Sequence, residues 1–443
     1  MNAKQSNDQG RASSFLDSLR QFLTPALWKQ AEQARQSQRR SSRWCTQPLV
    51  LTLLAMTWCC GDSQAERFET AKGFTAVCLA KRRRPGKHVQ GFQQALARLP
   101  MAVLRSVAQG LRQRLLQLFD LVTDGFFVVG CDGSSMECPR AEELERRLDP
   151  ALKKHAVPQV WVTALVHLRT GLLWAWRLGK GYNRERSHLR ALLPTLPAAA
   201  LVVADAGYNG YELARAITLA SVSFLIRMSG KDKLYTERQV RLRKFKEGEV
   251  FLWPHAARRH NLPPLRVRLI RIAVAERRDV WLLTNVLDKQ RLSAAQAARY
   301  YRWRWENEGL FRTFKRTLAK VKLTSRTIAL IHREAEGALL ATQLLLAQGV
   351  QGTKKRSTPQ RCSPRKVLLV MRAVILGRIG VRQRAAFHQR LAKALREERQ
   401  RTSAKVKRIW PRRFPHKPPK PPRFLTLSAA QKALATKLLG VAA

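Results

Sequence analysis

The sequence predicts a mixed α/β protein with a helical start, a β-rich insertion and a helical, basic end. Helical spacing of apolar residues persists to about residue 120, and strand-like apolar runs then alternate with helices. A polar, basic stretch with strand-like pieces follows at 231–285. We therefore expect a helical region at 1–120, an α/β domain at 121–355 and a helical region with a basic, proline-rich tail at 356–443.

The charge balance points to a polyanionic partner. The 443 residues include 83 Lys plus Arg against 30 Asp plus Glu, a formal net charge of +53. The bases are spread along the whole chain, and self-repulsion at this charge disfavours a compact state unless an anion is near. Nucleic acid is the expected partner because each neutralised phosphate releases counterions, and an anionic membrane surface is the competing interpretation.

The longest apolar run and the cysteines argue against a membrane or secreted protein. The run from Pro48 to Cys60 is shorter than the roughly 20 residues of a spanning helix, so we expect a buried helix. It also lies too far from the polar N-terminus to be a secretory signal. The seven cysteines form no C-x-x-C pair, which indicates reduced thiols in a cytoplasm and no zinc site.

Residues 121–230 predict three strands, a helix, a strand, a helix and a strand. The first strand, in "GFFVVGCDGSSM", is expected to end at Asp132, and a hairpin is expected between Gln159 and Gly181. The strand in "ALVVADAGY" is expected to end at Asp205. Within the insertion, "HAARRH" from His255 to His260 is interpreted as a solvated basic loop rather than a metal site.

Two segments outside the α/β region are basic loops or tails. "AKRRRPGKH", from Ala80 to His88, is either a solvated linker or a phosphate contact. The last 90 residues predict one more helix, followed by an extended tail from Arg401 to Arg423 that contains no acid.

Asp132 and Asp205 are candidate metal ligands. A carboxylate where an apolar strand stops is held rigidly yet open to solvent, and ligands collect at strand ends in open α/β sheets. Taken singly, however, an aspartate after a strand is more often a turn or helix-capping residue.

The stretch "YYRWRWENEGLFRTFK" adds a third acid. On a helix with about 100° per residue, Tyr301, Arg304, Glu308 and Lys315 share one stripe. A core-facing side is formed by Trp303, Leu310, Phe311, Phe314 and Leu318, and Arg312 and Arg316 lie just beyond the stripe. Glu308 is then either half of a helix salt bridge with Arg304 or Arg312, or the third carboxylate of a two-metal phosphodiester site.

The spacing Y-x2-R-x3-E-x6-K from Tyr301 to Lys315 resembles the signature of DDE transposases, in particular the bacterial insertion-sequence-four (IS-four) family. "CDGSS" around Asp132 and "ADAGY" around Asp205 resemble that family's two aspartate motifs. The resemblance covers roughly 120–350.

The resemblance implies a ribonuclease-H-like catalytic core with a β-rich insertion. It implies that Asp132, Asp205 and Glu308 bind two Mg²⁺ ions, for which Mn²⁺ can substitute. Further residues are implied to contact DNA: Tyr301, Arg304, Arg312, Lys315 and Trp281. For Trp281, a role in stacking on a flipped base competes with a place in the core of the insertion.

The family's reaction is cleavage at each transposon end, after which the freed 3′-OH attacks target DNA. The implied partners are double-stranded terminal inverted repeats and target DNA, with a homodimer in the DNA complex and a location on the bacterial nucleoid in the cytoplasm. Two alternatives stay open: a catalytically inactive or domesticated DNA-binding descendant, and a different ribonuclease-H-like nuclease.

Overall fold

A computed structural model describes residues 13–35, 44–80, 84–148, 157–180, 185–273, 279–320, 322–354, 358–396 and 420–441. The chain forms two compact units. Unit 1 comprises Met1–Leu121, Gly133–Arg184 and Asn307–Glu397, and unit 2 comprises Val122–Asp132, Glu185–Glu306 and Glu398–Ala443. Each unit is therefore assembled from segments that are far apart in the sequence.

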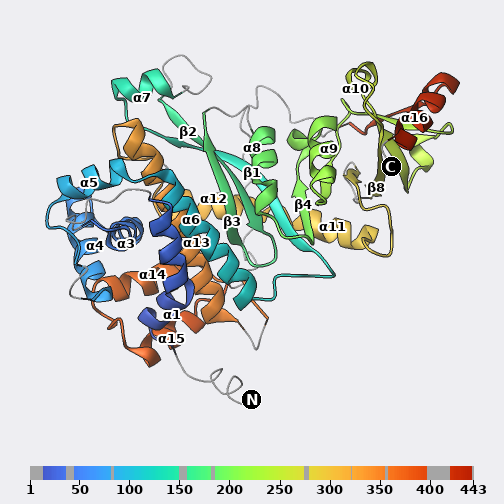
Figure 1. The fold of residues 1–443 in the computed structure, drawn as a ribbon. Coiled ribbons are helices and arrows are strands. Elements are labelled where there is room, and N and C mark those ends of the chain that lie inside the picture. The colour runs from blue at the N-terminus through green and yellow to red at the C-terminus, as the bar shows by residue number, and fades with distance from the viewer. Residues whose placement is uncertain are drawn as a thin grey trace, which may run out of the picture. The chain divides into compact units, whose positions relative to one another are not determined.

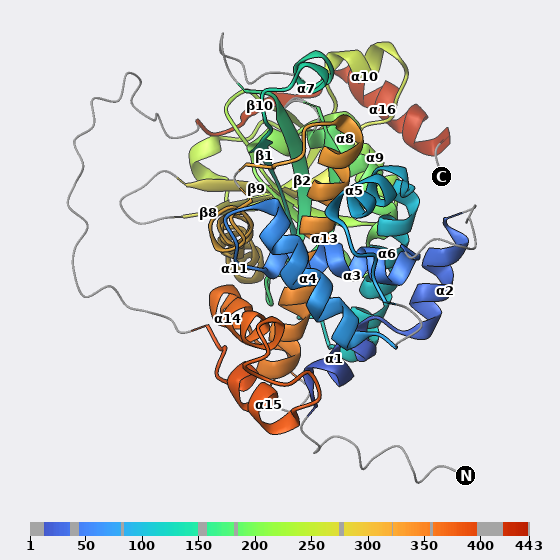
Figure 2. The same cartoon turned by 90° about the vertical axis from the view of Figure 1, so that its left-hand side faces the viewer.

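Unit 1 is mainly helical and is built around one long helix, α13 (Ile328–Thr353). Buried residues lie on nearly every side of α13, as expected of a helix surrounded by others. Figure 2 shows the neighbouring helices gathered about it. Further helices of this unit are α1 (Phe15–Phe22), α2 (Pro25–Gln33), α3 (Thr46–Trp58), α4 (Gln64–Cys78), α5 (Val89–Arg98), α6 (Met101–Leu118), α7 (Glu142–Arg147), α14 (Pro364–Ile375) and α15 (Arg384–Ala392), and most of α12 (Glu306–Arg312) also belongs to it.

The expected buried helix in the longest apolar run is confirmed as α3, which packs on α13 and α4. Its Trp58 indole N–H donates to the Ala341 carbonyl of α13 at 3.1 Å. No helix within the described ranges is long and apolar enough to cross a membrane.

The expected hairpin is also confirmed, as strands β2 (Gln159–His167) and β3 (Leu172–Gly179). The strands pair antiparallel with an irregularity between Leu165 and Val166. Helix α13 covers β3, and the Gln343 side chain donates to the Trp174 carbonyl at 3.0 Å. Helix α7, between β1 and β2, was not predicted from the sequence.

Unit 2 contains most of the sheet, with strands in the order β10-β6-β7-β8-β9-β5-β4-β1. Strand β1 (Phe127–Glu137) continues into unit 1. Strands β2 and β3, the next two in the strand order of the sheet, belong to unit 1. Strands β1, β4 and β5 run parallel. Strand β5 pairs antiparallel with β9, β9 with β8, and β8 with β7. The strands are β4 (Ala200–Ala204), β5 (Ser223–Arg227), β6 (Lys233–Thr236), β7 (Glu247–Leu252), β8 (Leu265–Ile272), β9 (Val280–Thr284) and β10 (Arg423–Thr426).

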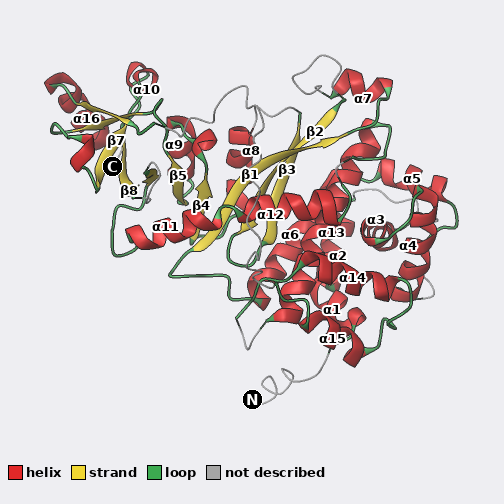
Figure 3. Ribbon diagram, turned by 180° about the vertical axis from the view of Figure 1, so that it is seen from behind, coloured by secondary structure: helices red, strands yellow, loops and turns green. Residues whose placement is uncertain are grey.

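The helices of unit 2 connect and flank these strands (Figures 1 and 3). Helix α9 packs on β5 and α8, and α11 packs on β4 and β8. They are α8 (Glu185–Leu192), α9 (Tyr211–Leu219), α10 (His255–Arg259), α11 (Ala294–Trp303) and α16 (Ala429–Val441). The expected order of three strands, helix, strand, helix and strand is found as β1-β2-β3-α8-β4-α9-β5, except that α7 lies between β1 and β2, and the insertion is mostly β.

Several local predictions were wrong. Strand β1 does not stop at Asp132 but continues to Glu137, and the segment expected as a loop after Pro254 contains the short helix α10. Three helices, not one, follow residue 354, and β10 pairs in parallel with β6. Most of the expected tail, 401–419, lies outside the described residues.

Candidate functional site

The parallel pairing of β1 and β4 brings Asp132 and Asp205 level within unit 2. Val129 lies opposite Val202 and Gly130 opposite Val203. Asp132 is two residues after Gly130, and Asp205 is two residues after Val203. Because neighbouring strands lie about 4.8 Å apart and side chains alternate between faces, this equal offset places both carboxylates side by side on one face. Both residues are half-buried.

The backbone after β4 orients Asp205. Strand β4 ends at Ala204, and Asp205 caps a short 3₁₀ turn, Ala206–Tyr208. Its Oδ1 accepts a hydrogen bond from the Gly207 N–H at 2.8 Å. The capping role that sequence alone allows for this aspartate is therefore real, and it fixes the side-chain rotamer while leaving the second carboxylate oxygen available.

A third acid, Glu185 at the start of α8, is affected by the charges of this pair, although the sequence analysis did not single it out. Burial raises the pKa of Glu185 to about 7, the Tyr208 hydroxyl opposes the shift, and the charges of Asp132 and Asp205 add to it. The buried Cys131 thiol is next to the same groups, and its pKa is raised first by burial and further by the three carboxylates. Helix α8 packs on α9, and the residues next to Glu185 in the sequence carry no signal for it.

The segment from Tyr300 to Lys315 is not the single regular helix that the sequence predicts. Helix α11 begins with a capping box formed by Ser293 and Gln296 and ends at Trp303. Helix α12 covers Glu306–Arg312, and a π-helical turn, Thr313–Thr317, follows. The wider π turn changes the angle per residue. Glu308 and Lys315 therefore do not share the stripe that was predicted for a regular α-helix.

The core-facing side of this segment is largely as expected. Leu310, Phe311, Phe314 and Leu318 are buried, whereas Trp303 is half-buried. The polar residues divide between the units, with Tyr301 and Arg304 in unit 2 and Glu308, Arg312 and Lys315 in unit 1.

In unit 2, Arg304 lies among aromatic rings. Its guanidinium lies 5.6 Å from the Tyr301 ring centroid and 5.2 Å from that of Trp305. The Arg304 Nε and the Tyr301 hydroxyl are buried without a hydrogen-bond partner within the described residues. Trp305 is 59% exposed, which makes it a large aromatic surface beside a cation. Its exposure could not be read from the sequence because the break between α11 and α12 was not predicted.

Tyr300, next to Tyr301, anchors α11 to the start of β1. Its hydroxyl donates to the Asp124 carboxylate at 2.7 Å and to the Thr123 carbonyl at 3.2 Å. Arg299 forms an ion pair with the same carboxylate. Asp124 and Gly125 have φ values of 48° and 77°, which allow the tight turn that feeds β1.

In unit 1, Glu308 and Arg312 are exposed and Lys315 is half-buried. Glu308 has neither a salt bridge nor a hydrogen bond within the described parts of the chain, so the helix salt bridge weighed from the sequence is absent there. Burial lowers the pKa of the Lys315 ammonium, and the negative charge of Glu137 opposes this shift.

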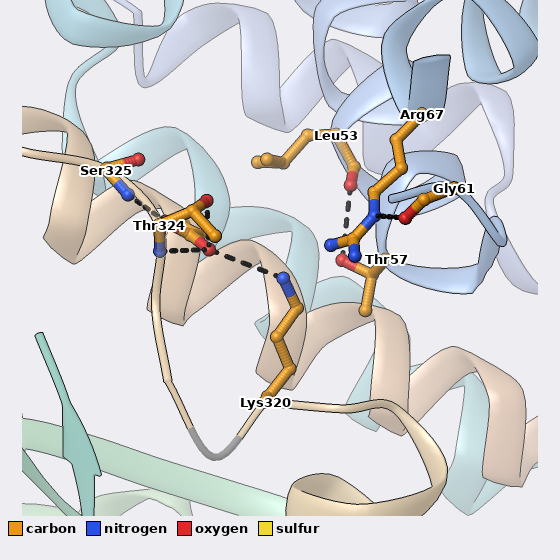
Figure 4. A network of polar contacts seen from close by, with 8 residues as sticks. Leu53, Thr57, Gly61, Arg67, Lys320, Thr324 and Ser325 are labelled. Atoms are coloured by element: carbon orange, nitrogen blue, oxygen red, sulfur yellow. Dashed lines mark hydrogen bonds and ion pairs between the residues drawn. The ribbon is translucent and has the colours of Figure 1, made fainter. Parts of the chain in front are cut away.

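The loop after the π turn is held by Glu334 of α13, and its partners Lys320, Thr324 and Ser325 are labelled in Figure 4. Its carboxylate accepts from the Thr324 N–H at 3.0 Å and the Ser325 N–H at 2.8 Å, and Lys320 lies 3.4 Å away. Burial alone would raise the pKa of Glu334, but the Lys320 ammonium and the N–H groups outweigh it and hold the pKa below its usual value. The Leu323 N–H also donates to the Glu137 carbonyl at the end of β1, at 2.8 Å.

Trp281 lies inside the insertion and is only 6% exposed. Its ring packs at 6.1 Å from Phe245, and the Arg271 guanidinium lies 5.5 Å from its centroid. This packing leaves no open ring face for a base, so the structure favours the insertion-core interpretation of this residue.

The acids present suit a hard divalent cation. Mg²⁺ is usually bound through one or two carboxylates together with water and substrate phosphate, which the Asp132 and Asp205 pair can supply. No three Cys, His, Asp or Glu side chains of the described residues already stand in a metal-binding arrangement. The donor chemistry therefore fits a cation that is shared with substrate rather than a closed structural metal centre.

Comparison with known proteins gives one family. The family described as "Transposase DDE domain" matches residues 128–344, just under half of the chain. This range contains Asp132, Asp205 and the whole segment from Tyr301 to Lys315. No curated protein sequence matches the chain. Among solved structures, the chain is similar to a piggyBac transposase in a synaptic complex with hairpin DNA, with a TM-score of 0.42 and 11% identity over 88% of this chain and 87% of that one.

Proposed function

We propose that this chain is a DNA transposase of the DDE class that cuts DNA at transposon ends and joins them to target DNA. The observation that carries the proposal is the register of β1 and β4, which sets Asp132 beside Asp205 inside a range that matches a transposase domain. Glu308, exposed and without an ion pair, is the third acid of the proposed set. The match to the transposase domain makes DNA cleavage and joining the first activity to test.

The strand orders also support this function. Unit 2 has the order β5-β4-β1 and unit 1 has β1-β2-β3, which is what a ribonuclease-H-like core requires. The spacing of Tyr301, Arg304, Glu308 and Lys315 supports a place in the IS-four family.

In the proposed reaction, water attacks phosphorus at the transposon end and the 3′-oxygen leaves as a hydroxyl. That 3′-OH then attacks a phosphodiester of the target, so one P–O bond forms and one breaks in each step. Asp132, Asp205 and Glu308 would hold two Mg²⁺ or Mn²⁺ ions, which polarise the phosphate and lower the pKa of bound water. The strand framework fixes the two aspartates, so they need no rearrangement when DNA arrives.

The cations of the segment are proposed to hold the DNA backbone next to the cut. Arg304, Arg312 and Lys315 can contact phosphates, and Tyr301 can donate a hydrogen bond to another. The net charge of +53 supplies additional non-specific affinity for double-stranded DNA. A homodimer on paired ends, in the bacterial cytoplasm, completes the proposal.

The test is cleavage of duplex DNA that carries the inverted repeats flanking the gene, in the presence of Mg²⁺. Asp132→Ala, Asp205→Ala and Glu308→Ala should each slow cleavage about a thousandfold, because several kcal/mol of transition-state stabilisation is lost. DNA binding in a gel shift should persist, since these acids hold metal and not DNA. Wild-type cleavage by the Asp205→Ala protein would overturn the assignment, and binding without cleavage by the unmodified protein would favour an inactive descendant.

A further inference from the structure

The connection between β6 and β7 in unit 2, residues 237–246, carries five bases and one acid, Glu237. We infer that this connection forms a further DNA-binding site, which holds phosphates of the DNA backbone in addition to the contacts proposed for the segment from Tyr300 to Lys315. The inference rests on the proposed function, since it names a place on the insertion where the DNA of that reaction is held.

The connection borders a hollow of about 540 Å³. Three cationic residues line it, Arg241, Lys244 and Lys246, and all three are exposed. A hollow of this volume falls within the range of about 300–1,000 Å³ that is usual for ligand sites. The connection therefore gathers three cations around a space that an anion can enter.

The acids around this hollow are already paired. Glu247, which also lines it, lies 3.4 Å from the guanidinium of Arg268, and Asp279 lies 2.6 Å from that of Arg271. Among the described residues, the three lining cations have no ion pair. The positive charge of the hollow is therefore left for solvent or for a bound anion to neutralise.

Arg271 of β8 fixes the backbone of the connection. Its guanidinium donates to the Arg243 carbonyl at 2.8 Å, and its backbone N–H donates to the Lys246 carbonyl at 2.9 Å. These two bonds hold the chain on both sides of Lys244. A solvated linker would spread its like charges apart, whereas this backbone is tied down while its cations stay together.

The C-terminal strand supports the same connection. The ring centroid of Phe245 lies 5.0 Å from that of Phe424 in β10 and 6.1 Å from that of Trp281 in β9. Strand β10 is itself paired with β6, and the Arg423 N–H donates to the Asp232 carbonyl at 2.9 Å. The connection is thus anchored by three strands, and a site ordered in advance loses less entropy when it binds.

The phosphodiester backbone fits the chemistry of this hollow. Arginine can hold a phosphate through two parallel N–H donors, and lysine acts as a point charge. The one aromatic residue of the lining, Phe245, already packs on Trp281 and Phe424 and offers no free ring for a base. A run of phosphates therefore suits the hollow better than a free nucleotide, and we expect no preference for base sequence.

The experiment measures binding of the full-length protein to duplex DNA of random sequence, by fluorescence anisotropy at several salt concentrations and with EDTA present. The triple variant Arg241→Gln, Lys244→Gln, Lys246→Gln should reduce the slope of log K against log salt by about 2.7, which is about 0.9 for each of three phosphate contacts. Lys244→Gln alone should reduce it by about 0.9. Both variants should melt within a few degrees of the unmodified protein, because the three residues are exposed.

The matched control is Lys289→Gln, Lys432→Gln, Lys437→Gln. It removes the same charge from exposed positions of unit 2 that do not line the hollow. Its slope should stay close to that of the unmodified protein. An equal reduction in this control would mean that only net charge matters, and would overturn the inference.

The remaining outcomes separate this inference from the proposed function. An unchanged slope in the triple variant, together with loss of cleavage in Asp205→Ala, would refute the hollow as a DNA site and leave the proposed function standing. If the triple variant lost binding of inorganic phosphate in calorimetry but kept its DNA slope, the hollow would be a small-anion site and the inference would be wrong. Failure of the unmodified protein to bind any duplex would overturn both.

Discussion

The candidate residues of unit 1 and those of unit 2 are held by different means. In unit 2, Asp132 and Asp205 take their positions from a backbone ladder between two buried parallel strands. In unit 1, Glu308 and Lys315 lie on a short helix and a π turn, and the loop that follows is fixed by side chains, chiefly Glu334. A ladder fixes register by the regular geometry of the sheet, whereas a side-chain network depends on each member.

This difference predicts different sensitivities to substitution. The aspartate pair should keep its geometry when single side chains nearby change, because backbone hydrogen bonds maintain the register. In unit 1, the π turn and the loop after it should lose their geometry when one residue of the side-chain network around Glu334 is removed. Buried polar networks are costly when only partly satisfied. The predictions below test this contrast.

The largest effect is expected for Glu334→Ala. Removing this carboxylate leaves the Lys320 ammonium, only 9% exposed, without its partner and two N–H groups without an acceptor. We expect a loss of about 3–5 kcal/mol in the free energy of unfolding, as for other broken buried pairs. Urea unfolding measures this free energy.

Glu334→Gln is the informative companion. Its amide oxygen can still accept from the Thr324 and Ser325 N–H groups, so it should cost less than the alanine variant. Equal losses in the two variants would mean that Glu334 stabilises the fold through its negative charge beside Lys320 rather than through the loop hydrogen bonds.

Replacing Trp281 and replacing Trp305 should have different effects, because one ring is buried in unit 2 and the other is exposed. Trp281→Ala should destabilise the protein by about 3–5 kcal/mol, because the ring is buried against Phe245. Trp305→Ala should change stability by less than about 0.5 kcal/mol, since the side chain is largely exposed. If Trp305 stacks on DNA, its loss should weaken DNA binding by about 1–3 kcal/mol. Unfolding curves and gel shifts on both variants give the four values, and unchanged DNA binding by Trp305→Ala would exclude stacking of this ring on DNA.

Much of unit 2 could be predicted from sequence because strands leave a local signal. An apolar run that ends at an acid gave β4, and the aspartate motifs pointed to Asp132 and Asp205. In unit 1, two apolar runs separated by a turn gave the hairpin β2-β3. The end of β1 was missed because "GSSME" after Asp132 is polar and small, yet it pairs within the sheet. Edge pairing of β10 with β6 joins residues almost 190 positions apart, and no local pattern encodes such a partner.

The segment from Tyr300 to Lys315 was harder to predict because its irregularities depend on tertiary contacts. Helical periodicity correctly gave the buried face of Leu310 and Phe314, but not the break at Arg304 or the π turn. Glu185 was missed for the same reason, since the groups that shift its pKa, Tyr208, Asp132 and Asp205, are distant from it in the sequence.

Lys315 and Arg312 should show how much the segment contributes to DNA binding. Each alanine variant should lower the slope of log K against log salt by about 0.9 if the residue contacts one phosphate. Lys315→Ala should have the larger effect on affinity, because its half-buried ammonium is already partly desolvated and is held beside Glu137. Salt titrations of binding to duplex DNA measure both slopes, and a slope equal to that of the unmodified protein in either variant would exclude that residue as a phosphate contact.

The smallest effect is expected for Tyr300→Phe. The substitution keeps the buried ring against Phe126 and removes the hydroxyl that donates to Asp124 and the Thr123 carbonyl. The cost should be about 1 kcal/mol, the usual net value of a hydrogen bond, because Asp124 keeps its ion pair with Arg299.

The same variant tests how α11 is held. If the hydroxyl only adds stability, cleavage and DNA binding should match those of the unmodified protein at temperatures well below unfolding. If it fixes α11 against the start of β1, Arg304 and Trp305 should lose their alignment and cleavage should fall by more than the stability loss explains. The second result would mean that unit 2, too, depends on side-chain anchoring where a helix meets the sheet, and that the contrast between the units applies to the aspartate pair alone.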